Sequence, residues 1–327
     1  MRCLALFSGG LDSLLAIRLM QEQGVEVEAI NFKTSFTCCQ DTSAQAARKL
    51  GVRLTILSAE DDYFDLVRHP QFGYGKGANP CIDCRIYMFE RAARLLPQFD
   101  ARFLVSGEVL GQRPKSQKRR DLEIIAHHSA DDLLLRPLSA KLLPPTLPER
   151  EGWVDRERLF DFVGRSRKGL IELAGQLGID EIPSPSNGCA LTETAFSKKV
   201  FDLIRLQPQN SRWDFELLET GRHFRLSSTT KAIVARNEAE TETLRRYFTE
   251  PPPGAEVARF QPANFLGPDA LAVGPLGEET AEQIAGLVLR YSRGEQTAEP
   301  RVLIESPTGV REIVATPFAA ATIAAGA

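Results

Sequence analysis

No stretch of this sequence is apolar over the roughly 20 residues that a membrane-spanning helix needs. The apolar residues 3–7 meet Ser-Gly-Gly at once, so they are too short for the core of a secretion signal. Positive charge is not in excess either, because Lys and Arg number 40 against 43 Asp and Glu. We therefore expect a cytoplasmic protein without a membrane partner, whose contacts with nucleic acid depend on local basic clusters.

Cysteine is also scarce, with six residues in a chain of 327. In a reducing compartment such cysteines indicate metal binding or catalysis more than a framework of disulfides. The chain length and its ordinary composition suggest two domains, each with a core of normal size.

Strand-like and helix-like segments alternate along the first part of the chain. We expect strands over 2–7, 25–32, 53–57, 102–106 and 133–136, and helices over 12–23, 43–50, 86–96, 117–126 and 165–177. Prolines between residues 137 and 153 indicate an extended loop. The alternation predicts an α/β fold with a doubly wound parallel sheet, which binds ligands at the carboxyl ends of its strands.

The pattern of expected secondary structure changes after about residue 210, where short strand-like segments appear at 231–234, 271–273 and 301–304. We expect two domains, an α/β domain over residues 1–205 and a smaller α+β domain over 206–327.

A glycine-containing loop joins the first expected strand to the first expected helix. Its glycines let the backbone approach a ligand, and its amides and helix dipole favour an anion. An isolated glycine turn that only links two elements is the structural alternative. The loop has no lysine, so it differs from the Walker type, and its residues are Ser8, Gly9, Gly10, Leu11, Asp12 and Ser13.

Three cysteines have a spacing that suits metal binding. Cys81 and Cys84 are three residues apart, and Cys189 follows a glycine in a proline-containing segment. Three thiolates would leave one iron of a [4Fe-4S] cluster open to sulfide, whereas zinc would need a histidine, Cys38 or Cys39 as fourth ligand. Buried, unreactive thiols remain a third interpretation. Cys38 and Cys39 are either structural or include a persulfide carrier.

A second motif ends the fourth expected strand at residues 106–112, Ser-Gly-Glu-Val-Leu-Gly-Gln. Gly107 is small where a strand end would face a nucleotide. Glu108 is a candidate ligand of Mg²⁺ or of a ribose hydroxyl, or an acid that stabilises a helix N-terminus. An Arg-Pro-Leu element follows at 136–138.

The loop at 8–13 resembles the SGGxDS motif of the PP-loop ATP pyrophosphatases, and the two later motifs resemble tRNA 4-thiouridine synthase. The resemblance implies that ATP is bound at the phosphate loop, with Mg²⁺, and that Asp12, Glu108 and Lys168 are catalytic. It further implies that adenine lies beside Asn31 and Phe32. The cysteine trio resembles the non-redox cluster site of a subset of tRNA thiolases. We expect a type that lacks the THUMP and rhodanese domains. The residues that would bind the nucleotide are Ser8, Gly9, Gly10, Asp12, Ser13, Asn31, Phe32 and Gly107.

Two basic clusters, residues 113–120 and 165–168, lie where RNA phosphates would approach. The C-terminal part resembles an NFACT-R RNA-binding domain at Arg236-Asn237 and Tyr291-Ser292, although Ala235 replaces the glycine of that motif. With 12 basic and 16 acidic residues over 211–327, this domain would hold RNA by shape and stacking. A homodimer interface is its alternative role.

Together these features predict ATP-dependent thiolation of tRNA, in which a uridine carbonyl is adenylated and sulfur from sulfide or a persulfide donor then releases AMP. Two alternatives stay open at this point. One is a PP-loop sulfur insertase that acts on a small molecule, and the other is a zinc-stabilised RNA-binding protein without catalysis.

Overall fold

The computed structural model describes residues 1–37, 43–184, 188–293, 298–320, 322 and 323. Its internal contacts divide the chain into two units, Met1–Ala190 and Leu191–Ala327. The division precedes the boundary expected after residue 205. None of the described helices has the length and apolar character needed to cross a membrane.

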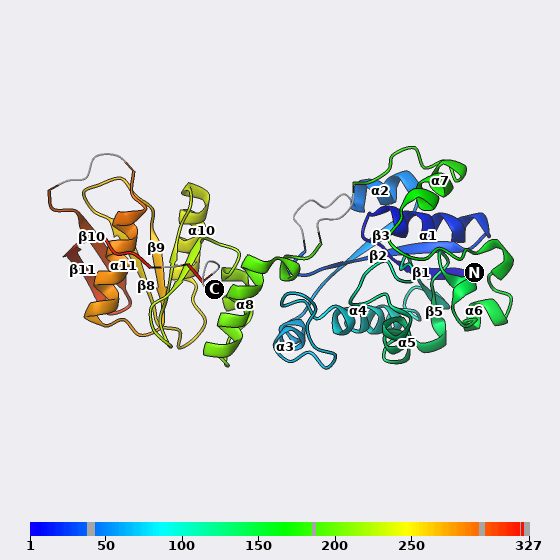
Figure 1. Cartoon of the computed structure of the whole chain (residues 1–327), viewed down its shortest axis with the longest axis horizontal. Helices are drawn as coiled ribbons and strands as arrows, with labels where there is room; N and C mark the ends of the chain where they lie inside the picture. Colours follow the sequence, from blue (N-terminus) through cyan, green and yellow to red (C-terminus); the bar gives the residue numbers. More distant parts are fainter. Residues whose placement is uncertain (38–42, 185–187, 294–297, 321, 324–327) are drawn as a thin grey trace. The chain divides into compact units, whose positions relative to one another are not determined.

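The first unit is built on a parallel sheet with strand order β3-β2-β1-β4-β5, as expected for an α/β fold (Figure 1). Its strands are β1 (Arg2–Leu6), β2 (Glu26–Lys33), β3 (Arg53–Ser58), β4 (Phe103–Ser106) and β5 (Leu134–Leu135). Its helices are α1 (Leu11–Glu22), α2 (Ser43–Leu50), α3 (Asp62–Arg68), α4 (Cys81–Arg94), α5 (Arg119–His127), α6 (Leu147–Arg150) and α7 (Lys168–Gln176).

Helices cover both faces of this sheet, with α1, α2 and α7 on one side and α4 and α5 on the other (Figure 1). Alternate residues of β1 show the reason. Cys3 and Ala5 pack with α1 and α7, whereas Leu4 and Leu6 pack with α4 and α5. Because both faces are buried, the strand reads as a continuous apolar run instead of an alternating one.

The strand order changes direction at β1, which pairs with β2 on one side and with β4 on the other. In open α/β sheets the ligand crevice lies at such a reversal, beyond the carboxyl ends of the two strands. The segments that follow β1 and β4 are the two motifs found in the sequence, so both reach this crevice.

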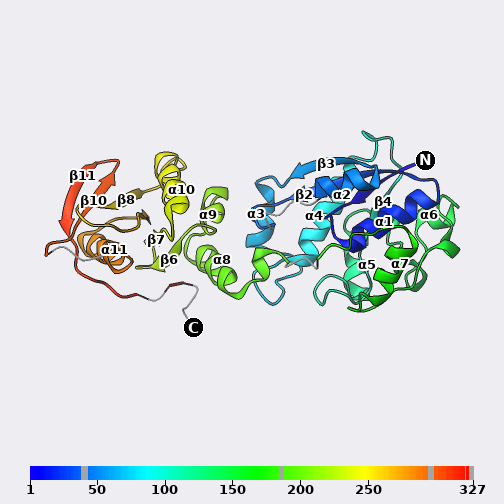
Figure 2. The ribbon, with the colours of Figure 1, turned by 90° about the horizontal axis from the view of Figure 1, so that it is seen from above.

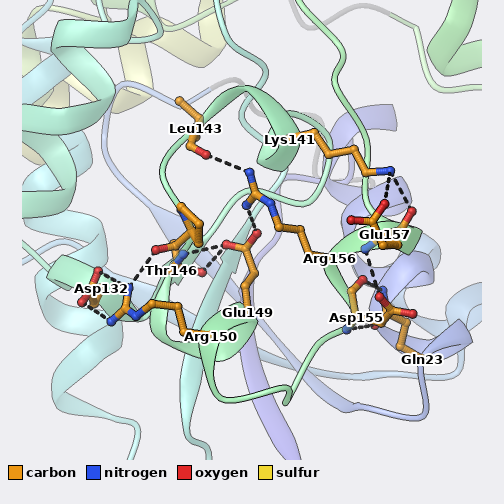
Figure 3. A network of polar contacts seen from close by, with 11 residues as sticks. Gln23, Asp132, Lys141, Leu143, Thr146, Glu149, Arg150, Asp155, Arg156 and Glu157 are labelled. Carbon is orange, nitrogen blue, oxygen red and sulfur yellow. Dashed lines mark hydrogen bonds and ion pairs between the residues drawn. The ribbon is translucent and has the colours of Figure 1, made fainter.

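The proline-rich segment is not the extended loop that its composition predicts. It contains the short 3₁₀ helix η2 (Ala140–Leu142) and α6, and η3 (Arg156–Arg158) follows it. The carboxylate of Glu149 accepts hydrogen bonds from the backbone amide of Thr146, at 2.8 Å, and from the guanidinium of Arg156 (Figure 3). The side chain of Glu149 is only 2% exposed. Polar side chains therefore order this segment where regular backbone pairing is sparse.

The second unit has a six-stranded antiparallel sheet with strand order β11-β10-β8-β9-β7-β6. Helix α11 packs on one face, and α9 and α10 pack on the other (Figures 1 and 2). This arrangement confirms the expected α+β character. The strands are β6 (Arg222–Arg225), β7 (Lys231–Val234), β8 (Val257–Pro262), β9 (Ala270–Val273), β10 (Arg301–Ser306) and β11 (Gly309–Val314). The helices are α8 (Thr194–Leu206), α9 (Arg212–Leu217), α10 (Glu238–Thr249) and α11 (Glu278–Arg290).

Polar contacts explain why α8 belongs to the second unit. Lys199 of α8 donates to the backbone carbonyl of Leu218 at 2.9 Å, and Asp202 pairs with Arg225 of β6 at 2.5 Å. Both pairs are largely shielded from water. Cutting the chain at residue 205 would therefore remove a helix that the second unit uses to satisfy its own charges.

Candidate active site

The loop after β1 is shaped by its glycines and serines. Gly9 has a φ of 76°, a left-handed conformation that favours glycine. The hydroxyl of Ser13 donates to the carbonyl of Gly10 at 2.9 Å, and the oxygen of Ser8 lies 3.4 Å from that of Ser13. The first turn of α1 follows directly, and its free amides make this loop a natural anion site.

Gly107, at the end of β4, lies directly against this loop. A Cβ at Gly107 would be 2.5 Å from the carbonyl carbon and oxygen of Asp12, and 2.6 Å from the amide nitrogen of Ser13. Glycine is therefore required here because the backbone of α1 passes so close. This reason differs from the expected one, in which Gly107 makes space for a nucleotide.

We expect Gly107→Ala to displace the start of α1 and to lower the rate of ATP cleavage by about tenfold or more, with a stability loss of about 1–3 kcal/mol. The measurements are pyrophosphate release and the thermal unfolding midpoint. Gly175→Ala is the matched control, because a Cβ at this position in α7 meets nothing within 4 Å. The control should keep full activity and gain slightly in stability. Wild-type activity in Gly107→Ala would contradict the close packing.

Asp12 is surrounded by groups from two other segments. Burial raises the pKa of the Asp12 carboxyl, while a hydrogen bond from Gln112 and the charges of Arg167 and Arg113 oppose that rise. Gln112 and Arg113 come from the segment after β4, and Arg167 immediately precedes α7. The acid of the phosphate loop is thus held by one amide and flanked by two cations.

Glu108 makes a contact that neither interpretation of its role included. Its carboxylate, only 3% exposed, pairs with the guanidinium of Arg136 at 3.0 Å. The other carboxylate oxygen lies 3.5 Å from Arg85 of α4 and has no hydrogen bond. Since Arg136 belongs to the Arg-Pro-Leu element, this buried ion pair joins the two later motifs. A role for Glu108 toward Mg²⁺ or ribose stays a prediction.

The guanidinium of Arg113 lies near both the phosphate loop and Cys81. Although Arg113 keeps an exposed surface, partial loss of water around its guanidinium and the nearby Arg85 lower its pKa, while Asp12, Cys81 and Glu108 act in the opposite direction. Arg85 lies one helical turn after Cys81, so both face the same side of α4. The charges of the phosphate loop, of the β4 motif and of α4 therefore meet around one guanidinium.

Cys81 and Cys84 lie in the first turn of α4, because this helix begins five residues before the expected start at Ile86. The side-chain amide nitrogen of Asn79 donates to the sulfur of Cys81 at 3.0 Å. Asp83 between the two cysteines points elsewhere and accepts the backbone amide of Gln71 at 2.7 Å. The side chain of Asp83 thus fixes the segment before α4, and both thiols stay on the helix N-terminal turn.

Tyr63 of α3 brings the third cysteine into the same neighbourhood. Its hydroxyl lies 3.3 Å from the sulfur of Cys84. Burial, followed by the nearby Cys84 and Cys189, raises the pKa of Tyr63 well above its usual range. The loop that carries Cys189 is fastened by a hydrogen bond of 3.1 Å from the amide of Ala190 to the carbonyl of Phe36. The three predicted cysteines are therefore gathered on one side of the crevice.

As they stand, no three His, Cys, Asp or Glu side chains of the described residues are close enough to hold a metal ion. The sulfurs of Cys81 and Cys84 instead have hydrogen-bonding partners in Asn79 and Tyr63. The donor chemistry nevertheless suits a soft metal centre, since three thiols share one neighbourhood. The cluster site stays a prediction, and Cys38 and Cys39 lie outside the described residues.

Comparison with known protein families adds two matches. Residues 1–141 match the family model described as thiamine biosynthesis protein (ThiI). The first unit is ThiI-like. Residues 221–325 match the model described as NFACT protein RNA binding domain. The resemblances to tRNA 4-thiouridine synthase and to an NFACT-R domain are thus confirmed, whereas that of the cysteine trio to a cluster site stays a prediction.

Individual relatives point the same way. The chain is 28% identical over 192 residues to a Thermococcus kodakarensis protein named "Probable tRNA sulfurtransferase", covering 56% of this chain and 44% of that one. It is 29% identical over 119 residues to "tRNA-specific 2-thiouridylase MnmA" of Acidithiobacillus ferrooxidans, covering 34% and 31%. The chain spans less than half the length of both relatives.

Among solved structures, one match is titled "Crystal structure of a 4-thiouridine synthetase - RNA complex with bound ATP". It shares 21% sequence identity and has a TM-score of 0.40, with 58% of this chain and 45% of that chain covered.

The structure places three further predicted residues of the ThiI-like unit, whose roles toward the nucleotide stay predictions. The side chain of Phe32, 8% exposed, packs in the core with α4 and does not form an open surface beside a base. The side-chain amide of Asn31 donates to the backbone carbonyl of Phe7 at 2.8 Å, so it ties the ends of β1 and β2 together. Lys168 begins α7 and is exposed, whereas the neighbouring Arg167 is the cation near Asp12.

The basic segment 113–120 of the ThiI-like unit has several separate roles. Lys115 donates to the carbonyl of Phe72 at 3.0 Å, and Arg119 donates to that of Leu142 at 2.8 Å. Lys118 and Arg120 are exposed. Only Arg113 lies among the charges of the site, and no local signal distinguishes it from its basic neighbours. Tyr63 and Asn79 were also missed, because the contacts that give them their roles come from the folded chain.

Proposed function

We propose that this protein is an ATP-dependent tRNA thiolase, which adenylates a uridine carbonyl and then replaces its oxygen by sulfur. The observation that carries this proposal is the convergence of Asp12, Arg113 and Cys81 from three separate segments at the β1–β4 crevice. The ATP-cleaving loop must activate the oxygen of the same carbonyl group whose carbon the sulfur then attacks, and this arrangement supports such an order of steps.

In the first step, a uridine carbonyl oxygen attacks the α-phosphorus of ATP, the bond to pyrophosphate breaks, and the neighbouring ring nitrogen gives up its proton to solvent. The amides of the loop and the cations Arg113 and Arg167 are positioned to balance the negative charge that develops. Asp12 is the carboxylate available to Mg²⁺, which commonly takes one or two carboxylates and completes its shell with phosphates and water. Glu108 is assigned to positioning, because its carboxylate is engaged by Arg136.

In the second step, hydrosulfide forms a bond to the activated ring carbon, and the bond from that carbon to AMP breaks. The proton of the hydrosulfide ends on the ring nitrogen. A [4Fe-4S] cluster held by Cys81, Cys84 and Cys189 would supply an iron without a protein ligand, to which sulfide can bind. Asn79 and Tyr63, which contact two of these sulfurs, would orient them.

The decisive experiment combines anaerobically purified protein with an unmodified tRNA transcript, ATP, Mg²⁺ and sulfide. We expect AMP, pyrophosphate and one thiolated nucleoside in equal amounts. Protein with bound iron that releases no pyrophosphate and forms no thiolated nucleoside would refute the proposal. Pyrophosphate release that depends on a small acceptor instead of tRNA would favour a sulfur insertase for small molecules.

Arg113→Ala tests the role of the guanidinium in the crevice. We expect pyrophosphate release to fall by about 10- to 100-fold, because one of the charges that face the phosphates is removed. Arg120→Ala is the matched control, since it removes another exposed arginine from the same basic segment, one that is not among the charges that act on Asp12. Iron content should not change in either variant. Equal losses in both would show that the segment acts only through its general charge.

A further inference from the structure

Six of the twelve arginines of the second unit are neutralised by a carboxylate. Since an arginine in such a pair adds little net positive charge, these residues contribute little attraction for a phosphate. The pairs are Arg225–Asp202, Arg236–Glu240, Arg245–Glu242, Arg259–Asp269, Arg301–Glu299 and Arg311–Glu278.

Arg222 and Arg290 are among the arginines for which no carboxylate partner is found within the residues that the structure describes; Arg290 only donates to the backbone carbonyl of Ala320 at 3.3 Å. Both lie against the same aromatic ring. The guanidinium carbon of Arg222 is 4.8 Å from the ring centre of Tyr291, and that of Arg290 is 5.6 Å from it. Arg222 opens the edge strand β6, and Arg290 ends α11. Two unpaired cations therefore share one tyrosine.

The ring of Tyr291 packs against the core of the second unit. Its ring centre lies 5.9 Å from that of Phe224, a fully buried residue of the core beneath α11. Tyr291 is partly exposed. A ring that is anchored on one side and flanked by two guanidiniums offers flat surfaces at little cost in conformational entropy.

The other motif that resembles an RNA-binding domain, Arg236-Asn237, already uses its side chains in contacts within the protein. The guanidinium of Arg236 pairs with Glu240, and its backbone amide donates to the same carboxylate at 2.7 Å. Asn237 caps α10 by accepting the amide of Glu240 at 3.0 Å. Arg236 and Asn237 thus hold the start of a helix, and Tyr291 is left as the motif residue with unpaired cations beside it.

We propose that Arg222, Tyr291 and Arg290 form a contact surface for RNA, on which an unpaired base stacks while the two guanidiniums bind flanking phosphates. The inference rests on the proposed function, because it assigns residues to its RNA-binding step. Bases stack on aromatic rings and on guanidinium planes, and single-stranded segments present both a base face and phosphates. An acidic peptide could pair with the two cations, but it would not stack on the flat faces of the ring and the guanidiniums.

The test uses the full chain, an unmodified tRNA transcript and a titration of NaCl. We expect the double variant Arg222→Gln, Arg290→Gln to bind tRNA about tenfold more weakly or worse. The slope of log Kd against log[NaCl] should become smaller by about one to two, as expected when two phosphate contacts are lost. Tyr291→Leu keeps an apolar side chain but loses the stacking face, so it should also weaken binding. Tyr291→Phe should bind like the wild type.

Arg301→Gln combined with Arg311→Gln is the matched control, because these arginines of the same unit already have carboxylate partners. The control should bind tRNA normally. ATP binding by each variant and its thermal unfolding midpoint verify that the fold is intact. If the wild type binds tRNA and the Arg222/Arg290 variant binds equally well, only this inference is overturned. If the wild type binds ATP but no tRNA, the proposed function fails together with it.

Discussion

Asp12→Asn should reduce pyrophosphate release by about a thousandfold or more and leave the protein folded. The carboxylate lies in the anion-binding loop, and it is the group there that can bind Mg²⁺ or orient the phosphates. The amide keeps the size of the side chain and its contact with Gln112, and it removes only the charge.

The stability of this variant separates a catalytic role from a structural one. Burial raises the pKa of Asp12, so its ionised form is disfavoured in the folded protein relative to the unfolded chain. Removing that charge at neutral pH should therefore leave the unfolding midpoint unchanged or raise it. Loss of activity without loss of stability is the expected pair of results, measured by pyrophosphate release and thermal unfolding.

Glu22→Gln is the matched control at the other end of α1. It makes the same chemical change in an exposed pair with Arg18 at 3.2 Å, which contributes little to stability. This variant should cleave ATP at the normal rate. Normal turnover by Asp12→Asn would remove Asp12 from the mechanism, whatever the result of the control.

Replacing any one of Cys81, Cys84 and Cys189 by Ala should abolish thiolation together with iron binding. Adenylation should survive, because the phosphate loop is built on β1 and α1, whereas the cysteines lie on α4 and on the loop near Tyr63. Three measurements on each anaerobically purified variant check this: iron content, pyrophosphate release and thiolated nucleoside.

Cys3→Ala is the control for these variants, since Cys3 is fully buried in the core beneath α1. It should cost about 1 kcal/mol of stability and keep iron and activity. Cys38→Ala or Cys39→Ala would lose thiolation but keep iron if that residue is a persulfide carrier. Zinc in the wild type, or wild-type thiolation by Cys189→Ala, would contradict a three-cysteine cluster.

Much of the first unit could be predicted, because local patterns determine it. The expected helix over 43–50 agrees with α2 (Ser43–Leu50), and the other expected strands and helices differ from the structure by a few residues at their ends. The start of α4 was placed too late, since the cysteines and the preceding proline did not resemble a helix. Helix α3 was missed because it is short and its aromatic residues Tyr63 and Phe64 have weak helical propensity.

The site was predictable in its motifs but not in its geometry. The glycines of the phosphate loop carry a local signal, whereas the close approach of Gly107 to Asp12 depends on how two distant segments pack. The same holds for Arg113, whose neighbours Asp12 and Cys81 come from other elements. A sequence identifies which side chains carry charge, and only the folded chain decides which of them meet.

The buried pair of Glu108 and Arg136 has a consequence for how such sequences diverge. Loss of Glu108 would leave Arg136 without its carboxylate in the interior, at a cost of about 3–5 kcal/mol, and loss of Arg136 would leave Glu108 with only the longer contact to Arg85. Replacement of both partners by apolar residues would be tolerated far better. Substitutions that pass through a single change are therefore strongly disfavoured. The two positions are 28 residues apart, and in related sequences they should be substituted together or not at all. The two motifs should therefore vary as one unit.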